Sequence, residues 1–215
     1  MANTYRSLKD HVYEYIADLI DSGKIEDNKI SEQHICDALN VSRTPVREAL
    51  IQLASDGYLE SMPRKGFRVK AISEESAKEI VEIIGPLDGR AALLALKHIT
   101  DKDLQQLHFL HNSMQMALNA KMYKKYDDLQ HEFHTFYIEK SGNEKLIAYL
   151  QKLNRHFMKR EYAHVEGSEL DALLQRANDE HAEIIRLFET HDGIRLQRYI
   201  RDVHWNIENA KFLAW

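Results

Sequence analysis

Apolar residues recur every three or four positions along most of this chain, which is the spacing of helices that each bury one face. Only 8 of its 215 residues are glycine and 3 are proline, so few positions interrupt the pattern. Hydrophobic residues make up 44% of the chain and charged residues 29%, a balance typical of a globular protein with a core. We therefore expect a mainly α-helical fold in which strands are confined to one short segment.

The first seventy residues predict three helices followed by a two-stranded hairpin. The helices are expected over Tyr5–Asp21, over Glu32–Leu39 with Ser31 as its cap, and from a cap at Ser42 to Asp56. Residues 58–70 then alternate around a basic tip, as the two strands of a hairpin do. Helix, helix-turn-helix and hairpin in this order form a winged helix-turn-helix unit.

Beyond residue 73 the pattern predicts about six helices and no strand. They are expected over residues 74–97, 101–120, 123–141, 143–164, 168–190 and 193–212. Their apolar stripes suit an antiparallel helical bundle. The expected division is therefore a winged helix-turn-helix domain over residues 1–72 and an all-helical domain over residues 73–215.

Basic charge is concentrated in one window, although the formal net charge of the chain is −5. Residues 1–40 contain 4 Lys or Arg against 8 Asp or Glu, whereas residues 41–70 contain 6 against 3. In that window Arg43 and Arg47 lie one turn apart on one face of a predicted helix. An arginine at the start of a recognition helix can donate two hydrogen bonds to a guanine in the major groove. The window therefore predicts contact with double-stranded DNA.

Other polar side chains of the window suit the DNA backbone. The hydroxyl groups of Ser42 and Thr44, at the start of the helix, suit phosphate oxygens. Arg64 and Lys65, at the hairpin tip, suit the neighbouring backbone or minor groove. A solvated helix with incidental arginines is the alternative, but it gives no reason for a basic hairpin tip at this distance.

Histidines gather in the second half, where 10 of the 12 lie after residue 73. His134, His181 and His204 fall on apolar faces of three different predicted helices. If they converge, three imidazoles can bind a divalent transition metal such as zinc or nickel. Three separate core histidines, each hydrogen-bonded to a neighbour, are the alternative. Because three histidines also hold zinc at hydrolytic sites, a metal-dependent hydrolase is a second alternative.

Other signals argue against an enzyme and against a membrane protein. The sequence has no nucleophile–base pair, no Gly-rich phosphate loop and no dinucleotide fingerprint. A single cysteine, Cys36, allows no internal disulfide, and neither a signal peptide nor an apolar run of membrane-spanning length is found. We therefore expect a cytoplasmic, non-enzymatic protein.

Residues 5–70 closely resemble the winged-helix domain of GntR-family transcription regulators. The resemblance is carried by "ISEQHICDALNVSRTPVREALIQLASDGYLE" and "PRKGFRV". It implies DNA contacts from Gln33, Ser42, Arg43, Arg47, Arg64, Lys65 and Gly66. Family members often carry Arg or another polar residue at the position of Gln33, whose amide can read an adenine edge or bind a phosphate.

Residues 74–212 resemble, more loosely, the all-helical FCD effector domain of the FadR-like branch of that family. The matching elements are "EFHTFYIEKSGN", "DEHAEII" and "RDVH". The resemblance implies that His134, His181 and His204 bind a divalent metal, which helps to hold a small carboxylate effector. The family's aspartate ligand falls at Gln130, a weaker oxygen donor. A position where many members carry an effector-binding arginine falls at Ile84.

The expected function is a sequence-specific transcriptional regulator, a repressor, that is dimeric through its helical half. Two recognition helices would then read an inverted repeat, and a small organic acid would change their spacing. The candidate effector-binding residues are Arg90, Tyr137, Asn154, Arg155 and Arg160. The alternative is a ligand-sensing adaptor whose N-terminal module binds protein instead of DNA.

Overall fold

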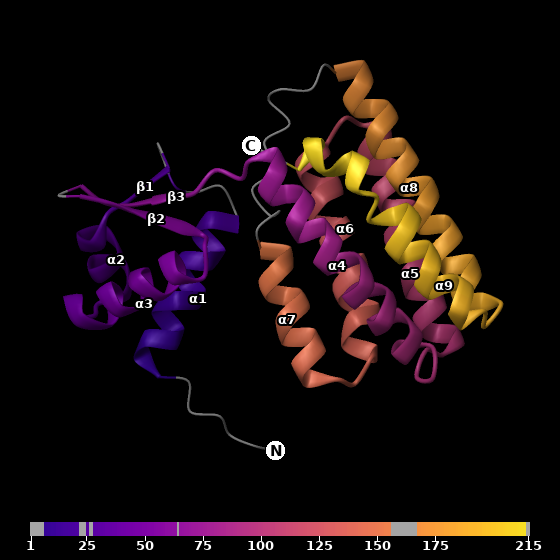
Figure 1. Ribbon diagram of the computed structural model, residues 1–215, viewed down its shortest axis with the longest axis horizontal. Coiled ribbons are helices and arrows are strands. Elements are labelled where there is room, and N and C mark those ends of the chain that lie inside the picture. The colour runs from indigo at the N-terminus through magenta and orange to yellow at the C-terminus, as the bar shows by residue number, and fades with distance from the viewer. Residues whose placement is uncertain (1–6, 22–24, 26–27, 64, 156–166, 214–215) are drawn as a thin grey trace. The chain divides into compact units, whose positions relative to one another are not determined.

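The computed structural model describes residues 7–21, 25, 28–63, 65–155 and 167–213 (Figure 1). The chain divides into two compact units, the first within Met1–Ala71 and the second beginning at Ile72. The mainly helical fold expected from the sequence is confirmed. In the described segments no helix combines the length and the apolar character that crossing a membrane requires.

The first unit is a winged helix-turn-helix, as the sequence predicts. Its elements are α1 (Leu8–Asp21), β1 (Lys29–Ile30), α2 (Glu32–Leu39), α3 (Arg43–Ser55), β2 (Leu59–Met62) and β3 (Gly66–Val69). The strands form an antiparallel sheet in the order β1-β3-β2, with Ile30 opposite Phe67. The third strand, β1, corrects the expectation of a two-stranded hairpin. The expected helix start at Tyr5 lies outside the described residues.

Local sequence signals set the ends of α2. The hydroxyl of Ser31 accepts a hydrogen bond from the backbone N–H of His34 at 3.2 Å and caps the helix start. Asn40 takes the left-handed conformation, with φ of 52°, and ends the helix, because a short polar side chain tolerates that region better than most. The turn between α2 and α3 is consequently short.

The core of the first unit lies between α3 and α1. Val46, Leu50 and Leu53 of α3 are fully buried, and α1 packs against them with Val12 and Ile16, which are also fully buried. This packing fixes which side of α3 faces outward.

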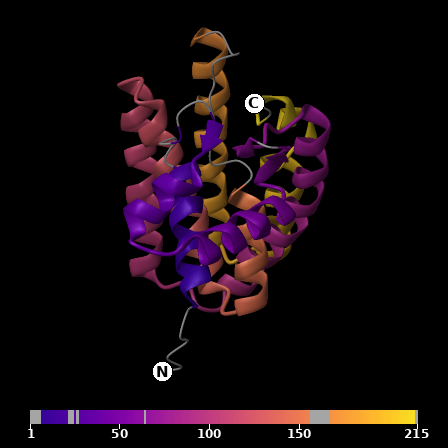
Figure 2. The same ribbon diagram turned by 90° about the vertical axis from the view of Figure 1, so that its left-hand side faces the viewer.

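The second unit is a helical bundle. Its elements are α4 (Glu74–Ala95), α5 (Asp101–Asn119), α6 (Tyr123–Lys140), α7 (Glu144–Arg155), α8 (Gly167–Glu189), α9 (Gly193–Tyr199), a π-helical segment η2 (Ile200–His204) and a 3₁₀ segment η3 (Ile207–Phe212). Figures 1 and 2 show the long helices lying side by side along a common direction. The helix expected over 143–164 is described only as far as Arg155.

The last helix departs from the sequence expectation of one helix over residues 193–212. The chain passes instead from α9 into the π-helical η2 and then, after a break at Trp205, into η3. Gly85 and Gly89 of α4 let this segment come close: a Cβ atom at Gly89 would lie 2.6 Å from the carbonyl oxygen of Gln197. A π-helical turn in such a place shifts the side chains that follow it, and here it sets the position of His204.

Candidate DNA-binding face and histidine centre

Four polar side chains share the exposed edge at the start of α3, and we call this edge the recognition face. Ser42, Arg43, Thr44 and Arg47 are all exposed, while Val46 and Leu50 on the opposite side are fully buried. Arg43 and Arg47 are four residues apart, so their side chains lie on the same side of the helix. The burial pattern thus leaves both guanidinium groups accessible to a ligand of the first unit.

The recognition face is joined to the start of α2. An Nη2–H of Arg43 donates a hydrogen bond to Oε1 of Gln33 at 2.9 Å, and Nε2 of Gln33 donates to Oδ1 of Asp37 at 2.8 Å. All three side chains are exposed. Gln33, which the resemblance singled out, therefore positions Arg43 in this structure.

Ser42 occupies the cap position of α3, but its hydroxyl makes no capping hydrogen bond within the described structure. The expectation of a side-chain cap at Ser42 is wrong in this respect. By contrast, Ser31, Ser73 and Thr100 each cap their helices through the side chain. The first turn of α3 therefore keeps backbone N–H groups available for an anion such as a phosphate.

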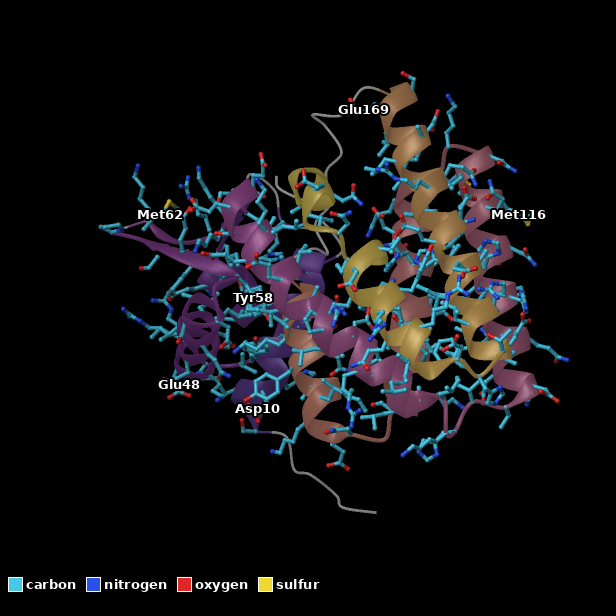
Figure 3. The ribbon with its side chains drawn as sticks, turned by 45° about the vertical axis from the view of Figure 1, so that its right-hand side comes forward. Asp10, Glu48, Tyr58, Met62, Met116 and Glu169 are labelled. Atoms are coloured by element: carbon cyan, nitrogen blue, oxygen red, sulfur yellow. The ribbon has the colours of Figure 1, made fainter. Side chains whose placement is uncertain are left out.

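The wing tip lies between β2 and β3. Lys65 is exposed, and its backbone N–H donates to the carbonyl of Met62 at 3.0 Å. Gly66 has φ of 83°, a region that glycine enters without strain, so it permits the turn. Arg64, the other basic residue expected here, lies outside the described residues. Glu48 and Met62, labelled in Figure 3, mark α3 and β2 of this unit.

Three histidines converge inside the second unit, and we call this group the histidine centre. His134 comes from α6, His181 from α8 and His204 from η2. Nε2 of His134 lies 3.3 Å from Nε2 of His181 and 3.0 Å from Nε2 of His204. The sequence placed these side chains on three separate helices, and the structure brings them together.

A carboxylate lies at Nδ1 of two of these rings, and one of the two, Asp88, is buried whereas Glu180 is partly exposed. Nδ1 of His134 lies 3.1 Å from Oδ2 of Asp88, and Nδ1 of His204 lies 2.9 Å from Oε2 of Glu180. A carboxylate at Nδ1 keeps the proton on that nitrogen and leaves the Nε2 lone pair free. Both lone pairs consequently face the middle of the centre.

Burial sets the charge state of this region. Burial lowers the pKa of His134, because desolvation penalises the imidazolium, so the neutral ring is favoured. Burial alone would raise the pKa of Asp88, but the hydrogen bonds from His134, Trp205 and Tyr137 hold that pKa below its ordinary value. Burial raises the pKa of Tyr137 well above its ordinary value, so the phenol keeps its proton and donates it to Oδ1 of Asp88 at 2.7 Å.

The separations from His134 fit a metal ion that binds both of the other imidazoles, and the ligand atoms of all three lie within 4.8 Å of one another. Two nitrogens that are each about 2.0–2.1 Å from a zinc ion, at angles between square and tetrahedral, lie about 2.9–3.4 Å apart. The separations of 3.0 and 3.3 Å from Nε2 of His134 match that range. Nε2 lone pairs at this distance repel one another unless a cation or a proton lies between them. Gln130, one turn before His134, adds a buried Oε1 that accepts no hydrogen bond from any described residue.

A pocket opens beside the histidine centre. It encloses about 620 Å³, part of it open to solvent. Its polar lining includes Gln130, His204 and Arg176, and the last is the one lysine or arginine among the described lining residues. An Nη2–H of Arg176 donates to Oδ1 of Asn209 at 3.2 Å. The full lining is Val81, Gln130, Leu173, Leu174, Arg176, Ala177, Glu180, His204, Trp205, Asn206, Asn209 and Leu213.

Of the residues that the sequence suggested for an effector, the three with described side chains are not among the described residues that line this pocket. Arg90 is exposed on α4, Asn154 is half-buried on α7, and Tyr137 is fully buried against Asp88. Of Arg155 only the backbone is described, and Arg160 lies outside the described residues. Their role in binding an effector stays a prediction.

Sequence reasoning missed Asp88, Glu180 and Trp205. Asp88 is 1% exposed and accepts a hydrogen bond from Nε1 of Trp205 at 2.7 Å. One signal was available: Asp88 follows Ile84 by one turn and precedes Ala92 by another, so an acid stands on the apolar stripe of its helix. A carboxylate at such a position requires a buried partner.

Comparisons with known proteins agree with this architecture. Residues 8–69 match the bacterial regulatory proteins of the gntR family, and residues 79–203 match the FCD domain. The Nta operon transcriptional regulator of Aminobacter aminovorans is 29% identical over 128 residues, which are 59% of this chain and 60% of that protein. The transcriptional repressor RspR of Escherichia coli (strain K12) is 30% identical over 105 residues, which are 49% of this chain and 46% of that protein.

The matched segments thus span less than two thirds of the length of these curated relatives. The solved structure of E. coli McbR/YncC has the same fold, with a TM-score of 0.77 and 21% identity over 95% of this chain and 97% of that one. A winged helix-turn-helix followed by a helical bundle is the architecture of a class of bacterial transcriptional regulators. The chain belongs to the gntR family of bacterial regulatory proteins, and its helical half is an FCD domain.

Proposed function

We propose that this protein is a DNA-binding transcriptional regulator, a repressor, whose operator affinity is controlled by a small organic acid. The observation that carries the proposal is the recognition face, where Arg43 and Arg47 project from the exposed side of a helix whose other side is buried. In this proposal residues 1–72 bind DNA, and residues 73–215 bind the effector and pair two copies. A dimer presents two recognition helices to an inverted repeat.

Gel-shift titrations at two salt concentrations test DNA binding. The probes are the DNA upstream of the protein's own gene and an unrelated duplex of equal length. Arg47→Ala should lower affinity for the specific duplex by about 10- to 100-fold and affinity for the unrelated duplex much less, because a bidentate contact to guanine is lost only on the specific site.

Lys78→Ala is the matched control, because it removes an exposed positive charge from α4, outside the recognition face. It should leave both affinities unchanged. Equal losses on both duplexes in Arg47→Ala would make Arg47 a phosphate contact. A wild-type protein that binds neither duplex would end the DNA-binding proposal in favour of a protein-binding module.

We propose further that His134, His181 and His204 hold a divalent transition metal. The convergent Nε2 atoms, the carboxylates behind two of the rings and the buried oxygen of Gln130 support this. Such an ion supplies a positive charge with coordination positions left open for a carboxylate. The residues around it orient the imidazoles: Asp88 and Glu180 hold Nδ1 protons, and Trp205 fixes Asp88.

Elemental analysis of protein purified without a histidine tag tests the metal. About one transition ion per chain is expected. His204→Ala should lose it, whereas His191→Ala, which removes an exposed histidine at the end of α8, should keep it. A wild-type protein without metal after growth in supplemented medium, or a His204→Ala variant with full occupancy, contradicts this site.

We propose that the pocket beside the histidine centre takes the effector, a small carboxylate with an apolar body. Leu173, Leu174 and Val81 supply apolar walls, and Arg176 supplies a cation that Asn209 orients. Thermal shift assays with short mono- and dicarboxylates should raise Tm for wild-type protein, and Arg176→Ala should abolish the shift. Arg186→Ala is the control, because Arg186 lies on the same helix and pairs with Glu183 instead. Equal shifts in both variants would exclude Arg176 from the binding site.

A further inference from the structure

An acidic side chain lies two hydrogen bonds away from an arginine of the recognition face. Asp37 is exposed on α2, which lies beside α3 (Figure 1). Its Oδ1 accepts a hydrogen bond from Nε2 of Gln33, whose Oε1 in turn accepts one from Nη2 of Arg43. A carboxylate so near a surface that binds phosphates weakens that binding, because like charges repel. This cost is offset if Asp37 makes DNA recognition more selective.

The three side chains can join in only one arrangement. A guanidinium group only donates hydrogen bonds, and an ionised carboxylate only accepts them. The amide of Gln33 lies between the two, so it must turn its oxygen to Arg43, at 2.9 Å, and its nitrogen to Asp37, at 2.8 Å. A flipped amide would set donor against donor and acceptor against acceptor. The orientation of Gln33 is consequently fixed at both ends.

Asp37 makes Gln33 a firmer support for an arginine that is surrounded by water. All three side chains are exposed, and a hydrogen bond between two long exposed side chains is weak, because both lose rotamer freedom. Gln33 and Asp37 are four residues apart on α2, the spacing at which glutamine and aspartate pair on one face of a helix. The carboxylate therefore anchors Gln33 to α2 and polarises its amide, which makes Oε1 a better acceptor for Arg43.

We propose that Asp37 is a specificity-determining residue of the first unit that acts without touching DNA. It is a positioning residue: through Gln33 it holds the guanidinium group of Arg43 in the orientation that reads a base. An arginine without this support can turn to a neighbouring phosphate, a contact that carries no sequence information. The charge of Asp37 also disfavours binding to every duplex, so both effects favour the specific site over unrelated DNA. The inference rests on the proposed regulator function and deepens it.

Selection from a pool of duplexes with a randomised central segment, followed by sequencing of the bound fraction, tests this role with the full chain. Arg43→Ala identifies the base pair that Arg43 reads, as the position where base preference is lost. Asp37→Ala should lower the preference at that base pair by about 5- to 10-fold, because Arg43 loses its support. It should keep the preference at the base pair that Arg47→Ala identifies, so unfolding cannot account for the loss.

Asp37→Asn separates the hydrogen bond from the charge. Its side-chain oxygen can still accept from Gln33, so base preference should stay within about 2-fold of wild type. Both Asp37 variants lose one negative charge, so both should bind an unrelated duplex about 2- to 5-fold more tightly at low salt, a gain that high salt removes. The double variant Gln33→Ala/Asp37→Ala should lose no more preference than Gln33→Ala alone, because Asp37 acts through Gln33.

Asp18→Ala is the matched control, because Asp18 is an exposed acid on α1, and it should leave base preference unchanged. If Asp37→Ala keeps its preference at the Arg43 position, or if Asp37→Asn loses as much as Asp37→Ala, the inference is wrong and the proposed regulator stands. Additive losses in the double variant, or an Arg43→Ala variant that keeps every base preference, overturn the inference in the same way. A wild-type protein that selects no sequence from the pool overturns both the inference and the proposed function.

Discussion

His134 and Asp88 meet between α6 and α4, with Nδ1 of the imidazole 3.1 Å from Oδ2 of the carboxylate. The same carboxylate accepts hydrogen bonds from the Tyr137 hydroxyl and from Nε1 of Trp205, each at 2.7 Å. The buried carboxylate of Asp88 therefore links α4 to α6 and to Trp205, the residue that follows His204, through hydrogen bonds. A carboxylate behind a metal-binding imidazole fixes the ring and raises its basicity.

Asp88→Asn should weaken metal binding without removing a ligand. The amide is neutral and holds the Nδ1 proton of His134 less firmly, so metal affinity should fall by about 10- to 100-fold. Competition with a chromogenic chelator measures that affinity. Asp179→Asn is the control, because Asp179 is exposed and accepts a hydrogen bond from Gln175 instead of a histidine. An unchanged metal affinity in Asp88→Asn would show that the Asp88 carboxylate does not support metal binding by the histidine centre.

Gly89→Ala should destabilise the second unit although alanine is the better helix former. The added Cβ would lie 2.6 Å from the backbone oxygen of Gln197, and backbone atoms cannot yield as a flexible side chain does. We expect a loss of about 1–3 kcal/mol in the free energy of unfolding, from the clash, reduced by up to about 1 kcal/mol through helix propensity. Urea denaturation gives the value. Gly167→Ala is the control, since a Cβ there meets nothing within 4 Å, and it should be neutral or slightly stabilising.

The helices could be predicted from the sequence because each has an apolar stripe of its own. Val46, Leu50 and Leu53 already indicate which side of α3 is buried, and so which side Arg43 and Arg47 share. Ser31 and Asn40 likewise mark the ends of α2 through local chemistry. These features depend on residues only a few positions apart, so they can be predicted from the local sequence.

The features that could not be predicted depend on residues far apart in sequence. The two-residue strand β1 exists through its pairing with Arg68 and Phe67, and two residues carry no periodicity. The π-helical η2 lies against α4 at Gly85, where an added Cβ would be 3.1 Å from the carbonyl oxygen of Arg201. Asp88 lies 46 positions from His134, and no motif links them. The three histidines are also far apart in sequence. Their convergence could therefore be inferred only as one of two alternatives, the other being three separate core histidines.

Acid should weaken the second unit through Asp103. Oδ1 of Asp103 accepts from Nζ of Lys140 at 2.7 Å, and Oδ2 accepts from the backbone N–H of Thr100 at 2.9 Å. The hydrogen bond from Lys140 above all, with those from Thr100, lowers the pKa of Asp103 from 3.8 to about 2. A carboxyl whose pKa is lower in the folded state stabilises the fold above its unfolded pKa and loses that contribution as the pH falls through the folded pKa.

Asp103→Asn therefore tests this pair by its pH dependence. The variant should be less stable than wild type by up to about 2 kcal/mol at neutral pH, and the difference should disappear as the pH falls from about 4 to about 2. Chemical denaturation at a series of pH values measures it. Asp128→Asn, which breaks an exposed pair with Lys124, should cost less than about 0.5 kcal/mol at any pH. A difference that persists unchanged at low pH would assign the loss to packing instead of charge.

Ser31 and Ser42 precede neighbouring helices of the first unit, yet their substitution should have opposite consequences. Ser31→Ala removes the hydrogen bond to the backbone N–H of His34 and should cost about 1 kcal/mol in the free energy of unfolding. Ser42→Ala removes no capping bond of the described structure, so its stability should change little.

In DNA binding, by contrast, Ser42→Ala should be the more strongly affected of the two variants. Ser42 lies on the recognition face beside Arg43, so losing its hydroxyl should weaken binding to specific and unrelated duplexes alike, as the loss of a phosphate contact does. Ser31→Ala, measured well below its Tm, should bind both duplexes with wild-type affinity. Urea denaturation and gel-shift titration on the same preparations supply both measurements. If Ser42→Ala is the less stable protein and binds DNA normally, the start of α3 is a structural cap, and the phosphate site must lie elsewhere on the unit.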